Sequence, residues 1–187
     1  MHVKGLEFPA YDPRGAFGAA LTYAVNPRGA CHRRAWPPAK EILGGVPPYT
    51  VEGKPAMIKG MFDDRCVFHS LIVCDYHANM VPLPMDYYAK CLSMVTGQEY
   101  TLDRLYWMAE RTETLIRMFN CREGFSRKDD QIPDRILLEP LPEGPAKGQI
   151  IGREGFNKML DEYYALRGWD TNGIPTPETQ ARYELNV

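Results

Sequence analysis

The sequence predicts an all-α chain whose helices are joined by long, proline-rich connections. Apolar residues recur at spacings of three and four over several segments, which is the pattern of helices with one buried face. No segment shows a convincing alternation of apolar and polar residues, and 16 Pro and 16 Gly punctuate the chain with turns. The length of 187 residues is enough to bury a substantial core, in one domain or in two small ones.

The first part of the chain predicts one helix between two turns. Residues 1–14 contain Pro9 and Pro13 and no helical period, so they are expected to be extended and to end in a turn. Residues 15–25 are rich in small side chains and predict a helix whose small face lets another group approach its backbone. Residues 26–29, Asn-Pro-Arg-Gly, are a strong turn signal.

A surface loop and a long helix are expected next. Residues 36–53 carry two Pro-Pro pairs and predict a loop with one helical turn near residues 39–43. A helix is expected from Glu52 onward, because Pro55 suits its first turn and an apolar stripe follows. Its end is expected near residues 75–78, before the following prolines.

Two helices in the middle of the chain have clear end signals. Residues 86–95 predict a helix closed by Gly97, and Thr101 is the expected N-cap of the next helix, which Gly124 ends. The apolar side chains of that helix are expected to form its buried stripe. They are Leu102, Leu105, Tyr106, Ala109, Leu115, Ile116 and Phe119.

The last third combines a long connection with two helices. Residues 125–152 show no period and contain four prolines, and loops of this length usually serve a function or wrap a neighbouring element. Residues 153–167 predict an amphipathic helix that Gly168 ends. Thr176-Pro177-Glu178 predicts the start of a short terminal helix.

Composition excludes several classes of protein. The 22 basic and 24 acidic side chains leave a net charge of −2, which argues against a nucleic-acid binder. No apolar run approaches the 20 or so residues of a membrane span, and the first residues lack the apolar stretch of a secretory signal, so a cytoplasmic protein is expected. The five cysteines are odd in number and contain no CxxC pair, so neither a disulfide framework nor a self-contained zinc site is expected.

Two groups of residues could carry chemistry. Tyr11 and His32 lie near turns, where an imidazole could transfer a proton and a tyrosine could orient a carbonyl group. A solvated turn with a hydrogen-bonded histidine is the structural alternative. The second group is Cys66, His69, Cys74 and His77, whose spacing does not suit a zinc site. A lone cysteine there could still be one thiolate ligand of an iron–sulfur cluster whose other ligands lie elsewhere.

Several long motifs resemble the aldehyde:ferredoxin oxidoreductase family of tungsten, bis-pterin enzymes. Residues 21–32 (LTYAVNPRGACH) look like the family's LAYATSNRGACH, and residues 64–74 (DRCVFHSLIVC) look like its DSLGLC region. Further similar runs cover residues 3–15, 96–102, 120–130, 139–148, 161–164, 168–170 and 173–176. The resemblance covers nearly the whole chain.

The resemblance implies that residues 1–187 are the C-terminal α-helical region of such an enzyme. Family members are several times longer and begin with a β-rich domain that cradles the pterins. That domain, the CxxCxxxC run with three cluster cysteines and the glutamate placed near tungsten have no counterpart in this sequence. The implied activity is oxidation of an aldehyde to a carboxylic acid with electrons passed to ferredoxin, and it would require the N-terminal part. The implied cofactors are a [4Fe-4S] cluster and a tungsten (or molybdenum) bis-pterin, both shared with that part.

The resemblance also implies roles for individual residues. Cys74 matches the fourth ligand of the cluster, and His32 and Tyr11 match residues beside the metal that move a proton and orient the substrate. The residues that match the pterin contacts are Ser70, Leu71, Asp75 and His69.

This sequence departs from the family pattern at two positions. His69 stands where the family has a pterin-binding Asp, and Ile72 stands where it has Gly. The missing Asp at position 69 motivates the alternative interpretation, which is a cofactor-free helical module with an interaction role or a relic of the enzyme. A stand-alone metal protein is the third hypothesis, and the cysteine spacing favours it least.

Overall fold

The computed structural model describes residues 1–76 and 83–185, and helices dominate that part of the chain. The two strands are β1 (His2–Val3) and β2 (Leu6–Glu7), and the longer helices are α1 (Phe17–Val25), α2 (Lys54–Ser70), α4 (Met85–Thr96), α5 (Leu102–Arg122) and α7 (Arg153–Arg167). The short helical segments are the 3-10 turn η1 (Pro13–Gly15), the π-helical turn η2 (Ala39–Leu43), α6 (Asp134–Leu138) and α8 (Pro177–Arg182). The all-α prediction is confirmed.

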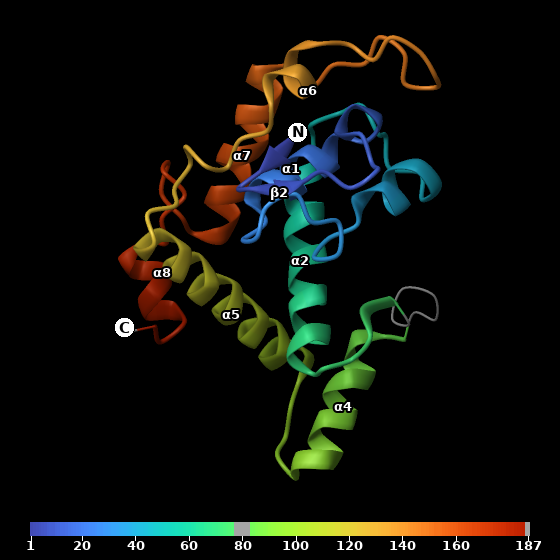
Figure 1. Ribbon diagram of the computed structural model, residues 1–187. Coiled ribbons are helices and arrows are strands. Elements are labelled where there is room, and N and C mark those ends of the chain that lie inside the picture. The colour runs from blue at the N-terminus through green and yellow to red at the C-terminus, as the bar shows by residue number, and fades with distance from the viewer. Residues whose placement is uncertain (77–82, 186–187) are drawn as a thin grey trace.

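Helix α1 lies at the centre, and all nine of its residues are buried. It packs against α2 and α7, and α2 also packs along α5. Figure 1 shows α2 running from the centre of the molecule to α4, which projects away from the other helices. A second, smaller apolar cluster fills this end, between the last turns of α2 and the residues of α4 and α5 that face them.

The small side chains of α1 allow a close approach, as the sequence predicted. The backbone N–H of Gly18 donates to Glu41 Oε1 at 3.0 Å, and a Cβ atom at position 18 would lie 2.8 Å from Glu41 Oε2. The fully buried Glu41 also forms an ion pair with the fully buried Lys54 at the start of α2. One buried carboxylate therefore joins α1, η2 and α2.

The expectation that the chain contains no strand is wrong at its N-terminus. β1 and β2 form an antiparallel hairpin in which Val3 pairs with Leu6. The two residues between them, Lys4 and Gly5, have φ angles of 48° and 81°, as in the tight turns that suit the twist of a hairpin. Strands of two residues are too short to show an alternating pattern in the sequence.

The predicted end of α2 is also wrong, because the helix stops at Ser70. A Schellman motif ends it: Val73 N–H donates to Phe68 O at 2.9 Å and Ile72 N–H donates to His69 O at 3.2 Å. Ile72 has the left-handed φ of 58° that this motif requires of the residue after the cap. Glycine usually fills that position, so the sequence contains no signal for this helix end.

The stripe predicted for α5 is only partly buried. Leu105 and Ala109 are buried, but Leu115 and Phe119 are 39% and 55% exposed. The buried residues of the second half of α5 are Glu113, Thr114 and Arg117. This helix therefore turns charged side chains toward the core, and a count of apolar spacing assigns its buried face wrongly.

The remaining predicted elements are confirmed. The predicted turn near residues 39–43, the helix over residues 86–95, the N-cap at Thr101 and the terminal helix are present, and α7 spans Arg153–Arg167 with Gly168 as its left-handed C-cap. The long connection over residues 125–152 contains α6, and its buried residues Ile132, Ile136 and Leu137 complete the main core. This connection thus wraps the domain's own helices.

A buried ion pair network centred on Asp130 links distant segments. Asp130 is fully buried and lies 2.6 Å from Lys4 Nζ, 2.7 Å from Arg117 Nη2 and, as a hydrogen-bond acceptor, 2.5 Å from Tyr164 OH. Burial raises the pKa of the Asp130 carboxyl. The charges and hydrogen bonds of Lys4 and Arg117 lower it by more than burial raises it, so the pKa lies below its ordinary value of 3.8. The carboxylate is therefore held ionised in the core.

Within the described residues, none of the helices combines the length and the apolar character that crossing a membrane requires.

Replacing Asp130 by Asn should lower the free energy of unfolding by about 3–5 kcal/mol, because two buried cations lose their counter-charge. Urea unfolding followed by circular dichroism measures this, and Asp134→Asn, in an exposed pair with Arg153, is the matched control.

The folded-state pKa of Asp130 is lowered, so its contribution to the free energy of unfolding is complete above pH 3.8 and is lost as the pH falls through the lower folded value. The variant should lack this part of the acid sensitivity, and equal acid profiles would contradict the assignment.

Candidate functional site

The predicted pair of Tyr11 and His32 comes together in the structure. The two rings lie with centroids 5.5 Å apart, and the ring of Trp36 lies 6.3 Å from that of Tyr11. Tyr11 follows the N-terminal hairpin and is 38% exposed, whereas His32 follows the turn after α1 and is half-buried. Three aromatic side chains from two loops thus form one cluster that remains open to solvent.

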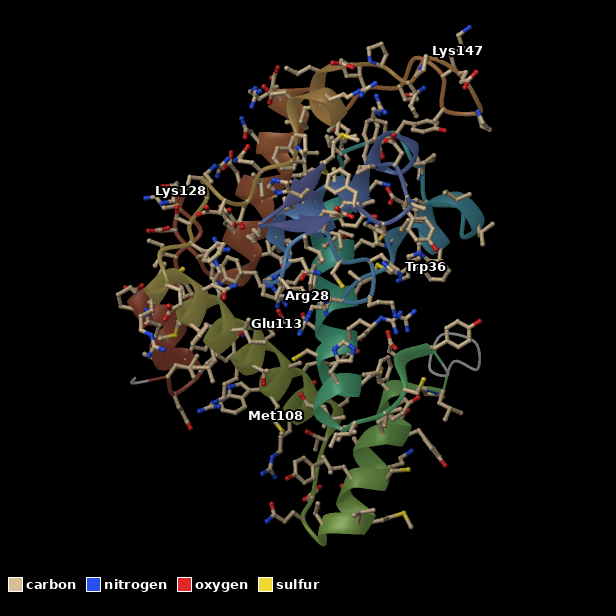
Figure 2. The ribbon with its side chains drawn as sticks, viewed as in Figure 1. Arg28, Trp36, Met108, Glu113, Lys128 and Lys147 are labelled. Atoms are coloured by element: carbon tan, nitrogen blue, oxygen red, sulfur yellow. The ribbon has the colours of Figure 1, made fainter. Side chains whose placement is uncertain are left out.

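Asn26 fixes the turn that carries His32. It is fully buried at the C-cap of α1, its Oδ1 accepts from Arg28 N–H at 3.1 Å, and its Nδ2 donates to Cys31 O at 3.1 Å. The turn also meets α5, because Asn120 Nδ2 donates to Pro27 O at 2.9 Å. Figure 2 shows Arg28 of this turn and Glu113 of α5 in the same central region of the molecule. The imidazole therefore sits on an ordered turn.

The surroundings of His32 favour its neutral form. Burial lowers the pKa of His32 below 6.5, the positive charge of Arg33 lowers it further, and Asp75 opposes this shift. A histidine that is neutral near pH 7 can accept a proton from a reacting group.

Trp36 is a site residue that the sequence did not predict. Its indole Nε1 is buried and has no hydrogen-bond partner among the described residues. A buried donor without a partner costs about 1–3 kcal/mol, so such groups often face a ligand or water. Figure 2 shows Trp36 at the edge of the molecule beside η2. A tryptophan before two prolines carries no sequence signal for this role.

The predicted cluster ligand, Cys74, is exposed on the loop that follows the Schellman motif of α2. His69 and Ser70, at the end of α2, are exposed, and Leu71 packs with Val73 against the smaller apolar cluster. The structure therefore places four of the predicted cofactor contacts in one short segment, with the thiol of Cys74 accessible.

Asp75 is the fifth predicted contact, and it connects this loop to the turn that carries His32. Its Oδ1 lies 2.6 Å from Arg33 Nη2, and its backbone oxygen accepts from Arg65 Nη1 at 2.9 Å. Asp75 Oδ2 is buried and has no hydrogen-bond partner among the residues that the structure describes, where its ion-pair contact is Arg65 Nη1 at 3.6 Å. The structure thus brings the His32 turn and the Cys74 loop to the same side of α2.

A self-contained metal site is absent from the part of the chain that the structure describes, where no three His, Cys, Asp or Glu side chains cluster suitably. Cys66 is buried, and burial together with Glu113 raises the pKa of its thiol to about 12, which disfavours the thiolate that a metal needs. His77 lies outside the described residues. These observations leave Cys74 as the exposed thiol of the predicted group.

Replacing Ile72 by Gly should raise the free energy of unfolding by about 1 kcal/mol. A β-branched residue at a left-handed φ carries backbone strain of about 1–3 kcal/mol, and Ile72 has such a φ. Glycine removes this strain but offsets part of the gain, because it loses more backbone entropy on folding. Ile72 is 93% exposed, so its removal costs little packing. Thermal or urea unfolding measures the change. Ile174→Gly is the control, because Ile174 has no positive φ, and it should destabilise the chain. A loss of stability in Ile72→Gly would contradict the strain.

Comparison with known proteins identifies the family. The profile of "Aldehyde ferredoxin oxidoreductase, domains 2 & 3" matches residues 1–185. The tungsten-containing aldehyde ferredoxin oxidoreductases of Pyrococcus furiosus and Thermococcus kodakarensis are 37% and 35% identical to this chain. These matches cover 92% and 96% of this chain but 29% and 30% of the relatives, so the chain spans under a third of their length.

More distant relatives carry other names. The "Aliphatic sulfonate oxidoreductase, WOR-like subunit" of Pyrococcus furiosus is 26% identical over 95% of this chain and 27% of that protein. Among solved structures, the active-site complex BamBC of benzoyl coenzyme A reductase with 1,5-dienoyl-CoA is similar, with a TM-score of 0.56 and 28% identity over 72% of this chain and 20% of that one. With the profile match over residues 1–185, these findings show that the chain belongs to the aldehyde ferredoxin oxidoreductase family and corresponds to its domains 2 and 3.

Proposed function

We propose that residues 1–187 form the C-terminal helical part of a tungsten or molybdenum bis-pterin and iron–sulfur oxidoreductase. The proposed reaction oxidises an aldehyde to a carboxylic acid and passes the electrons to ferredoxin in the cytoplasm. The observation that carries this proposal is the arrangement of an accessible thiol, Cys74, and a neutral imidazole, His32, on two loops joined by the Arg33–Asp75 pair. The family membership supports the same assignment.

The residues present fit a cluster and a pterin that are shared with another part of the enzyme. Cys74 is exposed, so its thiolate is accessible to a cluster whose other three thiolates come from another part of the enzyme. Asp75 Oδ2 is a buried acceptor that no described residue satisfies with a hydrogen bond, which suits a ring N–H group of a bound cofactor. Ser70, Leu71 and His69 lie in the same segment and would complete the contact.

The overall reaction fixes what the residues of this chain must do. An aldehyde and water give a carboxylic acid, two electrons and two protons. When bound, the pterin-held metal and the cluster would accept the two electrons and conduct them to ferredoxin. His32, neutral and half-buried, would accept a proton released at the reacting carbon's oxygen, and the Tyr11 ring beside it would orient the aldehyde.

The substrate class belongs to the proposal as well. The relatives' names refer to aldehydes, aliphatic sulfonates and a dienoyl-CoA, so family membership alone does not select one of them. The aldehyde assignment follows the relatives with 35–37% identity. The cofactor-free alternative rests on His69, which replaces the family's Asp.

Replacing Cys74 by Ala tests the proposal against the cofactor-free alternative. In the enzyme assembled from this chain and the N-terminal part, the variant should lose most of its cluster iron and its aldehyde-dependent dye reduction. Iron content and the visible absorbance of the cluster measure the loss. Cys91→Ala is the matched control, because Cys91 is half-buried on α4, and it should retain both. No cluster iron in the wild-type assembly or in either variant would favour the cofactor-free module, and full iron in Cys74→Ala would remove Cys74 as a ligand.

Replacing His32 by Gln tests its role in proton transfer. We expect kcat to fall about 100-fold or more, which is within the usual contribution of a general base. Because the pKa of His32 is lowered, the wild-type rate should be full above pH 6.5 and should fall as the pH drops through the lower value. The pH profile of kcat/KM, which reports the pKa values of the free enzyme, measures this. A variant that keeps the same acid limb as the wild type would remove His32 from the mechanism.

A further inference from the structure

The loop that carries Cys74 is attached to the rest of the molecule in two different ways. The backbone N–H groups of residues 71, 72 and 73 all return to carbonyl groups of α2, and these bonds close that helix. Between residues 74 and 76, the side-chain hydrogen bonds that the described residues make to the loop come from Arg33 and Arg65, and both converge on Asp75. The position of Cys74 therefore depends strongly on its neighbour Asp75.

The two arginines have different surroundings. The Arg65 side chain is 7% exposed and extends from α2. Its hydrogen bond to the backbone oxygen of Asp75 therefore anchors the loop on that helix. Arg33 is 43% exposed and directly follows His32 in the turn after α1. The Arg33–Asp75 bond spans 42 residues of sequence and ties the histidine turn to the cysteine loop. The three residues thus connect α2, the Cys74 loop and the His32 turn in series.

We propose that Asp75 is a positioning residue that sets the placement of the His32 imidazole relative to the Cys74 thiol. This inference rests on the proposed function, in which these two groups serve proton transfer and cluster attachment. The Arg33 end of the pair is 43% exposed and the Asp75 end is 14% exposed, so solvent screens the arginine and reduces what the pair contributes to folding stability. Reacting groups, in contrast, lose about 100-fold in rate when they are misplaced by about 1 Å.

Nuclear magnetic resonance of the 187-residue chain tests the connection without any cofactor. In Asp75→Asn, the amide signals of residues 31–34 should shift together with those of residues 73–76. Arg33→Gln removes the other partner of the pair and should also shift both sets of signals. At residues 31–34, the double variant should shift the signals little beyond the shift of either single variant. The control is Asp134→Asn, whose ion pair with Arg153 has the same 2.6 Å length but is exposed at both ends, and it should leave both sets unchanged. Unchanged signals at residues 31–34 in Asp75→Asn would overturn the inference.

The enzyme assembled with the N-terminal part provides the functional test. Asp75→Asn should keep its cluster iron, change the electron paramagnetic resonance signal of the reduced cluster, and lower kcat about 100-fold while KM changes little. Wild-type kcat and an unaltered signal in this variant would overturn the positioning role. If the wild-type assembly holds no cluster while the amide signals remain coupled, the proposed function fails and the connection through Asp75 stands. The two failures are therefore distinguishable.

Discussion

The fold depends on one buried carboxylate, that of Asp130. Its partners come from three separate elements: Lys4 from the hairpin turn, Arg117 from α5 and Tyr164 from α7. Lys4 Nζ also donates to the carbonyl oxygens of Ala24 and Asn26, where α1 ends and the turn to His32 begins. The same network that closes the core therefore places the histidine turn.

The sequence predicts helix ends marked by glycine, but it does not predict a buried helix face that carries charged residues. The ends of α7 were predictable, because a left-handed glycine after a helix leaves a direct signal in the sequence. The buried face of α5 was not, since its second half turns Glu113 and Arg117 inward, where Arg117 pairs with Asp130. Periodicity recognises apolar stripes only. A buried charge becomes recognisable once its partner, 13 residues away in this case, is placed in space.

The candidate site divides in a similar way. His32, Tyr11 and Cys74 could be named from the sequence through family resemblance, and the structure brings Tyr11 and His32 into contact. The contact of Arg33 with Asp75 could not be named, because nothing in two surface-type residues 42 positions apart indicates that they meet. Trp36 was missed for the same reason: its indole N–H has no hydrogen-bond partner within residues 1–76 and 83–185, and this is a property of the packing.

The close contact between Gly18 and Glu41 has a consequence for how this family can vary. A methyl group at position 18 would collide with the carboxylate, and a shorter residue at position 41 would leave the buried Lys54 without its partner. Positions 18, 41 and 54 should therefore be exchanged as a set over evolution. Loss of the charge at position 54 would remove the partner of the buried acid at position 41, and that acid is the group that a side chain at position 18 would meet.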